Sequence, residues 1–367
     1  MYQVCVYAIA KNESQFVDRW VDAVSEADLI IVTDTGSTDD TVERLRRRGV
    51  TVYEYPMEHF RFDEARNECL RHVPDTVDIC VAPDLDDVME PGWRAKLEAA
   101  WAPGTHRGQY LYNWSFHPDG TPAVQYIHQR IHSRHGYRWI YPTHEVLEFT
   151  GEAPEQSVFL EGVVYNHHPD TAKYRGFNVE LLELAVQEDP QGARNLHYLG
   201  REYLFLGRWQ EAIDVLERYL ALPHATWREE RAASMRFIGR ACRELGRAKD
   251  ASDWFRRAAA EAPGTREPLV ELAWLAYGEG DWPAVNRWAG EALEITRKSL
   301  AYANEAFAWG SLPWDLMALS CHALGLHDRA VEFSRQAVDL DPANERLRQN
   351  HALYEAAADA QGGPTAP

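Results

Sequence analysis

The sequence has few cysteines and no long apolar stretch. Its five cysteines are widely spaced and form no Cys-x-x-Cys pair. We therefore expect neither a disulfide framework nor a zinc site, and a reducing cytoplasm is the simplest compartment. No apolar run reaches the roughly 18 residues of a membrane span. Residues 1–10 contain no basic leader and no cleavage site, so the sequence predicts a cytoplasmic protein without a membrane span.

An excess of basic charge is also missing. The chain has 38 Lys and Arg against 57 Asp and Glu, a net charge of −19. Such a chain repels phosphate backbones, which disfavours nucleic acid as a partner. The length of 367 residues corresponds to about two domains. With 45% hydrophobic residues, each domain has enough apolar side chains for a core.

The first part of the chain, residues 1–170, alternates strand and helix patterns. Short apolar runs predict strands, and amphipathic stretches between them predict helices. The expected strands are 4–9, 29–32, 50–55 and 77–82, and the expected helices are 14–24, 41–48 and 62–73. Further strands are expected at 110–116, 124–132 and 158–166. This alternation indicates an α/β, Rossmann-like domain with a mostly parallel sheet.

The second part, residues 171–355, is helical and repetitive. Four similar stretches share a glycine, and these glycines are 39, 34 and 45 positions apart: Gly207, Gly246, Gly280 and Gly325. The period is typical of tetratricopeptide repeats, which predicts an all-α solenoid. We expect each glycine where two helices cross closely, followed five residues later by a packing alanine. The third repeat departs, because Ala284 comes one place early. Residues 356–367 are expected to be a disordered tail.

Polar clusters follow three of the expected strands, at residues 11–13, 34–41 and 84–87. Carboxyl ends of parallel strands share one edge of a sheet, so these clusters should form one pocket. In extended backbone Asp84 and Asp86 would point to the same side and would repel without a cation. Carboxylate oxygens suit Mg²⁺ or Mn²⁺. The alternative is that Asp86 or Asp87 caps a helix near Pro91.

Two nucleotide-binding motifs are absent. No Gly-x-Gly-x-x-Gly occurs, and the loop after the second strand has one glycine and no following lysine. This excludes a Walker phosphate loop and argues against a dinucleotide oxidoreductase. In that loop, Asp34 could accept a hydrogen bond from a nucleotide base. The alternative for Asp34 is a turn aspartate that caps the following helix.

Taken together, these stretches resemble a known enzyme family. The chain is similar to glycosyltransferase family 2, which has the GT-A fold. The similarity lies in KNE after the first strand, in VTDTGSTDDT, FDEARNECL, PDLDD, WIYPTHEVL and NHHPD, and in the repeats that follow them. The order of the parts is similar to repeat-bearing members that include sublancin-type peptide S-glycosyltransferases and some lipopolysaccharide-core glucosyltransferases.

The resemblance implies an inverting hexosyltransferase that uses a divalent metal, Mn²⁺ or Mg²⁺, and a nucleoside diphosphate sugar, with UDP expected as the nucleotide. It implies a DXD motif at 84–86 in which Asp86 ligates the metal and Asp84 touches ribose or metal. His167 would complete the metal or diphosphate site, and Glu145 would be the catalytic base. Donor-binding positions would be Ala8, Lys11, Glu13, Asp34, Arg66, Leu85 and Trp139.

Alternatives stay open at several of these positions. His144 competes with Glu145 as the base, and His168 competes with His167 for the site. Glu145 could instead pair with one of Arg130, Arg134 or Arg138, and His167 could be a hydrogen-bonded loop histidine. The basic segment 128–138 either steadies an anionic ligand or forms an exposed hairpin. Trp139 and Tyr141 could form a stacking wall for a sugar ring.

The acceptor and the role of the repeats are also open. Sugar transfer requires a neutralised diphosphate and a group that takes the acceptor's proton. We favour a peptide or protein side chain as the acceptor, bound with help from the repeats, which could also mediate a homodimer. A glycan, a lipid or a hydroxymethylated DNA base are alternative acceptors. A non-catalytic scaffold and a nucleotidyltransferase are the rival functions.

Overall fold

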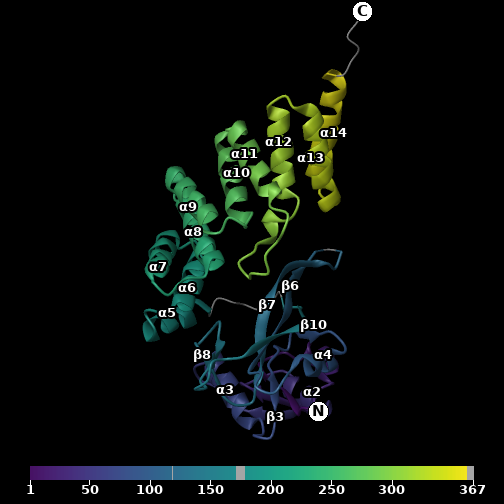
Figure 1. The fold of residues 1–367 in the computed structure, drawn as a ribbon, viewed down its shortest axis with the longest axis vertical. Coiled ribbons are helices and arrows are strands. Elements are labelled where there is room, and N and C mark those ends of the chain that lie inside the picture. The colour runs from purple at the N-terminus through teal and green to yellow at the C-terminus, as the bar shows by residue number, and fades with distance from the viewer. Residues whose placement is uncertain (118, 171–177, 362–367) are drawn as a thin grey trace, which may run out of the picture. The chain divides into compact units, whose positions relative to one another are not determined.

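The computed structural model describes residues 1–117, 119–170 and 178–361. The chain forms two compact units, one spanning Met1–Tyr198 and the other beginning at Leu199 (Figure 1). The first unit therefore extends past position 170, where the sequence placed the domain boundary, and includes α5 (Asn178–Glu188) and the start of α6 (Ala193–Phe205).

An eight-stranded sheet forms the centre of the first unit, in the order β3-β2-β1-β4-β7-β6-β10-β5. Its parallel half consists of β1 (Val4–Ala10), β2 (Leu29–Asp34), β3 (Thr51–Glu54) and β4 (Ile79–Val81). The rest consists of β5 (Asp87–Met89), β6 (Arg107–Phe116), β7 (Pro122–Ser133) and β10 (Ser157–His167). β7 is antiparallel to both β4 and β6, and β10 runs parallel to β6. The predicted α/β domain with a mostly parallel sheet is confirmed, and β1, β2, β4 and β10 all end at the same edge.

The helices that link the parallel strands are α1 (Val17–Val24), α2 (Thr41–Arg47) and α3 (Phe62–His72). All three were predicted. α4 (Trp93–Ala100) corresponds to the helix near Pro91 that was considered only as an alternative. Three strands were missed, namely β5, β8 (Tyr137–Ile140) and β9 (Val146–Phe149). The last two pair only with each other as a small antiparallel ribbon. Each of these elements is short, so its hydrophobic period spans too few residues to be recognised.

Two apolar clusters cover the faces of the sheet. One contains the fully buried side chains of Trp20, Trp93 and Tyr165. The other contains Cys5, Cys69 and Cys80 together with Tyr7. All five cysteines are free thiols and buried, so the expectation of no disulfide is confirmed. Burial raises the pKa of the Cys5 thiol to about 12, which keeps it neutral and unreactive.

Helix pairs build the second unit. They are α6 with α7 (Trp209–Ala221), α8 (Arg228–Glu244) with α9 (Ala248–Glu261), α10 (Glu267–Glu279) with α11 (Trp282–Glu294), and α12 (Leu312–Ala323) with α13 (His327–Leu340). A final helix, α14 (Glu345–Gln361), follows. Residues 356–361 are thus helical where the sequence predicted a tail, and residues 362–367 lie outside the described residues.

The repeat glycines have a different role from the one predicted. Gly207, Gly246, Gly280 and Gly325 end the first helix of each pair with φ between 72° and 76°. A Cβ on Gly246 would meet no atom within 4 Å, so these positions need glycine for its left-handed backbone and not for a close crossing. The close crossings occur at Gly200 and Gly239, where a Cβ would lie 2.4 Å from Leu216 and 2.5 Å from Phe255.

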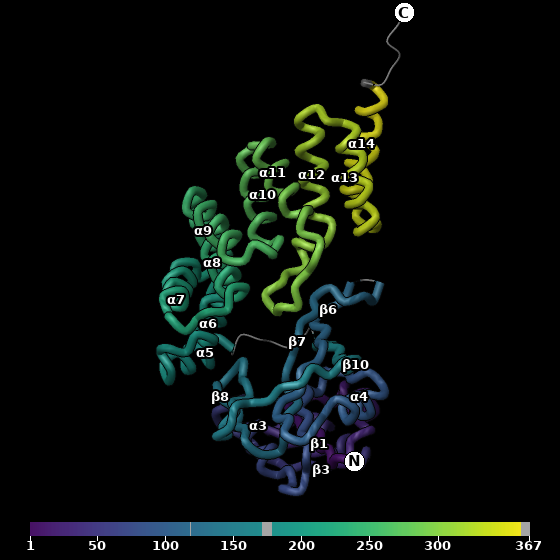
Figure 2. Tube along the Cα trace, viewed as in Figure 1, coloured from purple at the N-terminus to yellow at the C-terminus, as the bar shows by residue number. Residues whose placement is uncertain are grey.

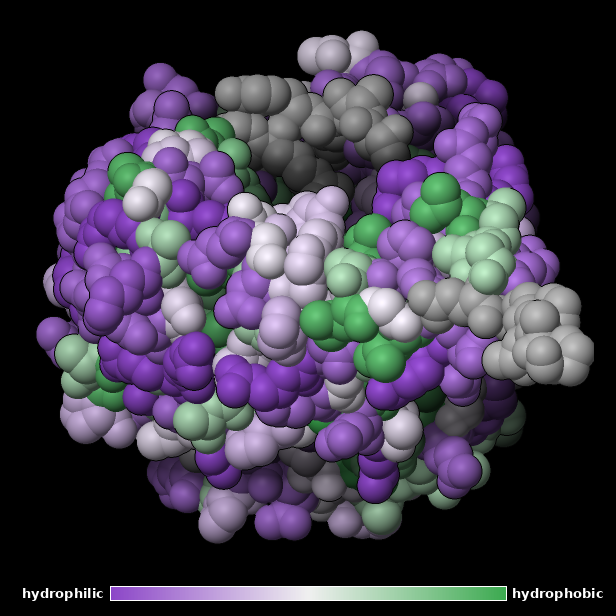
Figure 3. All heavy atoms as spheres, turned by 90° about the horizontal axis from the view of Figure 1, so that it is seen from above, coloured by the Kyte–Doolittle hydropathy of each residue, from purple (hydrophilic) through white to green (hydrophobic). Residues whose placement is uncertain are grey.

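The third repeat keeps the common register. Five residues after its glycine the buried position is Val285, which is 0% exposed, while Ala284 next to it is partly exposed. Valine therefore replaces the alanine found in the other repeats. Seen from above, the surface is mainly hydrophilic, with apolar side chains in small separate groups (Figure 3). In the described ranges, every helix is too short or too polar to span a membrane.

Candidate functional site

The first two polar loops are hydrogen-bonded to each other at the carboxyl edge of the sheet. The amide of Asn12 donates to Ser37 Oγ at 2.8 Å, and the amide of Thr38 donates to Asn12 Oδ1 at 2.7 Å. The amide of Glu13 donates to Thr41 Oγ1 at 2.9 Å. Asn12 adopts φ of 54°, which turns the chain back toward the second loop. The side chain of Lys11 is exposed at this edge.

Asp34 organises its own loop. Its Oδ2 accepts from the amides of Gly36 at 2.9 Å and Ser37 at 2.8 Å, and its Oδ1 accepts from Ser37 Oγ at 2.5 Å. The residue is 3% exposed. Asp34 thus has the turn part of the alternative role, but the side chain that accepts from the amide of Thr41 at the start of α2 is that of Asp39. The contact of Asp34 with a nucleotide base stays a prediction. A cavity of about 680 Å³ lies beside Asp34, lined by residues that include Gly36, Glu54 and Pro56.

The third polar loop is a turn and not extended backbone. The amide of Asp87 donates to the carbonyl of Asp84 at 3.1 Å. Asp87 Oδ2 accepts from the amide of Asp84 at 3.0 Å, and its Oδ1 accepts from the hydroxyl of Tyr112 at 2.7 Å. Burial, and then the charges of Asp84 and Asp86, raise the pKa of Asp87 to about 7. The expectation that Asp84 and Asp86 share one side through an extended strand was wrong, because the turn sends their carboxylates to different partners.

The alternative of a helix cap in this loop is also wrong. The residue before α4 is Gly92, with φ of 80°, and the amides of Gly92 and Arg94 donate to Glu26 and not to Asp86 or Asp87. Asp87 instead lies in β5, which pairs with the end of β10. The acidic loop is therefore tied to the last strand of the sheet.

Arg66, from α3, joins the two carboxylates expected to do chemistry. Its Nη2 donates to Asp84 Oδ1, and its Nε donates to Glu145 Oε1 at 2.5 Å. Arg66 is 1% exposed. Arg130, from β7, donates to Asp84 Oδ2 at 2.7 Å and to Glu145 Oε1 at 3.3 Å. Although burial alone would raise it, the charges of Arg130 and Arg66 hold the pKa of Asp84 well below its usual value.

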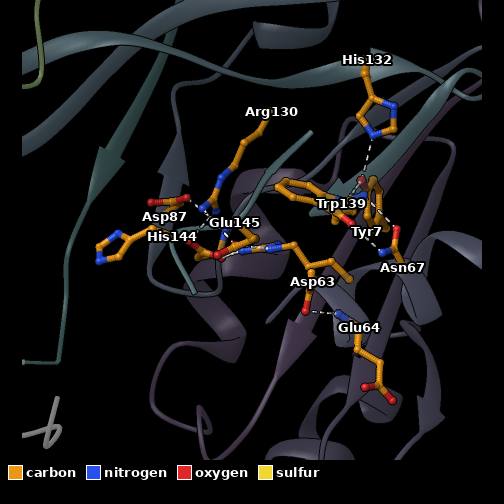
Figure 4. A network of polar contacts seen from close by, with 12 residues as sticks. Tyr7, Asp63, Glu64, Asn67, Asp87, Arg130, His132, Trp139, His144 and Glu145 are labelled. Atoms are coloured by element: carbon orange, nitrogen blue, oxygen red, sulfur yellow. Dashed lines mark hydrogen bonds and ion pairs between the residues drawn. The ribbon is translucent and has the colours of Figure 1, made fainter. Parts of the chain in front are cut away.

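Glu145 keeps one oxygen free of these contacts. Figure 4 shows Arg130 and Glu145 pointing toward one another. Both hydrogen bonds to Glu145 end at Oε1, and Oε2 receives none from the described residues. The ion pair with Arg130 that was considered above is present, with Arg66 as a second partner. A proton acceptor at Oε2 remains compatible with it, because each carboxylate oxygen has its own lone pairs.

Trp139 lies beneath the two arginines and not at the surface. The guanidinium carbons of Arg66 and Arg130 lie 4.8 and 5.7 Å from its ring centre. Its Nε1 donates to the hydroxyl of Tyr7 at 2.8 Å, and the residue is 2% exposed. The expected stacking wall for a sugar is therefore wrong for Trp139, whose ring is covered by cation–π contacts. Tyr141 is half-buried, with φ of 80°.

A second polar chain, which the sequence did not indicate, runs from Trp139 through Tyr7 to His132 (Figure 4). Tyr7 donates its hydroxyl hydrogen to His132 Nε2 at 2.8 Å, while His132 Nδ1 lies 2.7 Å from the carbonyl of Ser133. Burial lowers the pKa of His132 to about 3, so its ring is neutral and can accept from Tyr7. Asn67 bonds both the amide and the carbonyl of Trp139. The sequence could not reveal this chain because its members come from four distant elements.

His144 turns away from Glu145 (Figure 4). Its backbone is left-handed, with φ of 49°, and its ring stacks on Tyr198 with centres 3.9 Å apart. Arg194 Nε donates to the carbonyl of His144 at 2.9 Å. Of the two candidate bases, Glu145 is the one placed among the arginines.

His167 faces the acidic loop. Its Nε2 lies 3.3 Å from Asp86 Oδ2, and its Nδ1 lies 3.2 Å from the carbonyl of Trp114. A carbonyl can only accept, so Nδ1 carries a hydrogen and Nε2 presents its lone pair toward Asp86 when the ring is neutral. Burial lowers the pKa of His167, but the hydrogen bond and charge of Asp86 outweigh it and raise the value. The neighbouring ring of His168 instead stacks on Phe116.

This donor set fits a hard divalent cation that keeps water and phosphate ligands. Asp86 and His167 offer one oxygen and one imidazole nitrogen, and Mg²⁺ or Mn²⁺ takes its remaining ligands from water and diphosphate. Within the described part of the chain, no three or more His, Cys, Asp or Glu side chains are grouped to hold a metal. The expected triad of Asp84, Asp86 and His167 is therefore not assembled, because Asp84 is held by the arginines.

Two of the expected donor-binding residues are inside the core. Ala8 is 0% exposed in the middle of β1, and Leu85 is 2% exposed. Both belong to the apolar cluster on one face of the sheet. Ala8 lies in the strand that precedes the first polar loop, and Leu85, although its backbone belongs to the third polar loop, places its side chain in the core.

Comparisons with known proteins identify both units. Residues 5–141 match the family model described as glycosyl transferase family 2. Residues 196–230 and 313–344 match models of the tetratricopeptide repeat. The sublancin-type subgroup is not distinguished by these matches and stays a prediction.

Several solved structures match half of the chain or less. The APC/C hetero-tetramer Cut9-Hcn1 matches with 16% identity and a TM-score of 0.40, over 50% of this chain and 33% of that one. The pilF protein of Pseudomonas aeruginosa matches with 16% identity and a TM-score of 0.38, over 48% of this chain and 72% of that one. Glucosyl-3-phosphoglycerate synthase of Mycobacterium tuberculosis, solved with Mn²⁺, UDP and glucosyl-3-phosphoglycerate, matches with 25% identity and a TM-score of 0.27, over 30% and 44%. The match thus spans 33% of the Cut9-Hcn1 chain and 44% of the glucosyl-3-phosphoglycerate synthase chain.

Proposed function

Because this chain carries a glycosyltransferase domain of family 2 followed by tetratricopeptide repeats, we propose that it transfers a hexose from a nucleoside diphosphate sugar, with a divalent metal, to a polypeptide side chain. The observation that carries the proposal is the pairing of Asp86 with His167 at the edge where β1, β2, β4 and β10 end. Arg66 and Arg130 connect Asp84, two residues before Asp86, to a second carboxylate, Glu145, which they orient.

The nucleotide would lie along the first two polar loops. The cavity beside Asp34 has room for a nucleoside, since about 680 Å³ exceeds the lower limit of small-molecule sites. Asp34 holds the amides of Gly36 and Ser37 and so fixes the backbone that faces this cavity. Base recognition would then come from a preformed loop.

Asp86 and His167 would hold the metal. When bound, a divalent cation neutralises the negative charge that develops on the departing diphosphate. The hydrogen bond between His167 and the Trp114 carbonyl fixes the ring so that Nε2 faces the diphosphate side. Lys11 is exposed at the same edge and can pair with phosphate oxygens.

Glu145 would take the proton of the acceptor. In a single displacement the acceptor oxygen or sulfur bonds to the anomeric carbon, the bond from that carbon to the diphosphate oxygen breaks, and the acceptor proton moves to Glu145 Oε2. The electron pair of the broken bond leaves with the diphosphate, and the anomeric configuration inverts. Arg66 and Arg130 hold Oε1 and so aim Oε2.

The repeats favour a polypeptide acceptor, because stacked helix pairs commonly bind extended peptides. If the acceptor is a glycan, a lipid or a hydroxymethylated base, an acceptor screen by intact mass would detect the added sugar on that molecule. Such a result would change the acceptor and leave the donor site as proposed.

The test is nucleotide release from a panel of nucleoside diphosphate sugars, with Mn²⁺ or with a chelator. We expect slow, metal-dependent release with one preferred donor. Changing both Asp84 and Asp86 to alanine should abolish it, and turnover that survives this double change would refute the site. Release without metal would refute the metal dependence alone.

A further inference from the structure

The segment between α11 and α12, residues 295–311, is longer than the corresponding links of the other repeats and folds back on earlier helices (Figure 2). It contains one short 3₁₀ turn, η1 (Ala306–Ala308), which contacts α10 and α12. Its Ala301, Asn304 and Ala308 are buried. All of these residues belong to the second unit.

Glu305 anchors this segment to α8. Its two oxygens accept from Nη1 and Nη2 of Arg240 at 3.0 and 2.9 Å, a bidentate pair. Arg236, which is 1% exposed, also pairs with Glu305 and donates to the carbonyl of Ala303 at 3.3 Å. Arg236 and Arg240 lie one turn apart on α8, so both guanidinium groups converge on one carboxylate.

A buried carboxylate on α10 holds the other end of the segment. Glu267 is 2% exposed, and its Oε1 accepts from the amide of Glu305 and from Nε1 of Trp309, each at 3.0 Å. The guanidinium carbon of Arg266 lies 4.3 Å from the Trp309 ring centre. That of Arg240 lies 5.2 Å from the ring centre of Phe307. Residues 302–309 therefore supply one carboxylate and three aromatic rings, of which Phe307 and Trp309 lie against these arginines and Tyr302 donates its hydroxyl hydrogen to Glu230.

The segment supplies partners for the charges on this helix face, and Glu271 of α10 supplies a further one, since Arg240 Nε also donates to it. Taking an ion out of water costs several kcal/mol unless a partner and hydrogen bonds compensate it. Glu267 Oε1 accepts from groups of Glu305 and Trp309, and the partner carboxylate of Arg236 is Glu305. A helix face that needs only to pack would carry apolar residues here. Arg236 and Glu267 are buried beneath the segment, and the charged donors and acceptors with which they hold it are of the kind that a polypeptide-recognising surface uses.

We propose that the face formed by Arg236, Arg240, Arg266 and Glu267 is a peptide-binding site that residues 302–309 occupy in cis. Its partner is a polypeptide with one carboxylate followed two and four residues later by aromatic side chains, the pattern of Glu305, Phe307 and Trp309. Two guanidinium groups recognise the carboxylate, and Glu267 recognises an amide and an indole hydrogen. The site lies within the repeats and does not depend on the transfer reaction.

The test uses a fluorescent synthetic peptide with the sequence of residues 300–311, LAYANEAFAWGS, and the full chain. In one variant a glycine–serine linker of equal length replaces residues 302–309. We expect this variant to bind the peptide with micromolar affinity. The wild-type chain should bind about 100-fold more weakly, because a segment in cis competes at an effective concentration in the millimolar range. A peptide with Glu305→Gln should not bind the linker variant.

Two controls decide the outcome. A full-length Glu305→Gln chain keeps the segment but loses its anchor, and it should bind the peptide at least about 10-fold better than wild type, which corresponds to ~1.4 kcal/mol. A linker variant with intact helical circular dichroism that binds no peptide would overturn the proposal. Loss of helical signal in both variants would overturn it too, because a segment without which the helices do not fold is not a displaceable ligand. Neither assay needs donor or metal, so failure here leaves the proposed transferase function untouched.

Discussion

Arg66 and Glu145 form a buried ion pair between α3 and the residue that precedes β9. The Nε of Arg66 donates to Oε1 of Glu145 at 2.5 Å, and the two side chains are 1% and 5% exposed. Because Oε2 accepts from none of the described residues, the pair orients the carboxylate without using both of its oxygens. This is the relationship from which the proposed chemistry follows.

Replacing Glu145 by glutamine removes the proton acceptor and keeps the side-chain shape. We expect the transfer rate to fall by about 10²-fold or more while donor affinity is retained. Steady-state kinetics and calorimetry of donor binding check this. Glu148→Gln, in β9 and paired only with the exposed Arg138, is the matched control and should leave both quantities unchanged. A loss of donor affinity in Glu145→Gln would move Glu145 to a binding role.

Removing the Arg66 charge should destabilise the first unit. Arg66→Met leaves Glu145 buried with Arg130 as its remaining partner, and breaking a buried pair costs about 3–5 kcal/mol. Arg138→Met breaks an exposed pair and should cost less than about 1 kcal/mol. Urea unfolding of both variants measures the difference. Equal free energies of unfolding would show that the buried network contributes no more than a surface pair.

The neutral His132 predicts a defined loss of stability in acid. Its pKa is about 3 in the folded protein and about 6.5 when unfolded. The unfolded state therefore binds one more proton between these two pKa values. The share of the free energy of unfolding that depends on neutral His132 is complete above pH 6.5 and declines as the pH falls. Lowering the pH from 7.5 to 5.5 should reduce the free energy of unfolding by about 1.4 kcal/mol through this group. His132→Gln, which keeps an acceptor for Tyr7, should lose this part of the pH dependence, and an unchanged slope would contradict the assignment.

The two kinds of repeat glycine should respond differently to asparagine. Gly246 has φ of 72° and open space around it, and asparagine tolerates that backbone, so Gly246→Asn should cost under about 1 kcal/mol. Gly239 touches Phe255 across the helix pair, so Gly239→Asn should cost at least about 2 kcal/mol. Thermal unfolding of the two variants checks the order. The reverse order would restore the close-crossing explanation for the repeat glycines.

Much of the fold could be predicted from the sequence, because its signals are local. The runs that became β1, β2 and β4 are continuous and apolar, and the repeat period is visible without any structure. β5 escaped because its three residues lie in an acidic stretch and are defined only by pairing with β10. The left-handed backbone of the repeat glycines was not predicted either.

The candidate site was predicted by residue type better than by geometry. Arg66, Glu145, Asp86 and His167 were all candidates from the sequence, and the structure joins them through contacts between residues far apart in the chain. The turn at 84–87 was not foreseen, because nothing local signals that Asp87 folds back to accept from the amide of Asp84. Nor could the sequence show that Trp139 is covered by two arginines, since that depends on where α3 and β7 meet.

The most direct test of the central claim is a crystal structure with UDP and Mn²⁺, with the manganese located by its anomalous scattering. We predict the ion between Asp86 and His167 Nε2, bound to diphosphate oxygens, and its loss in Asp86→Asn but not in His168→Gln, whose ring stacks on Phe116 instead. Manganese bound elsewhere, or UDP bound equally well with Asp86 replaced and no ion present, would contradict the account.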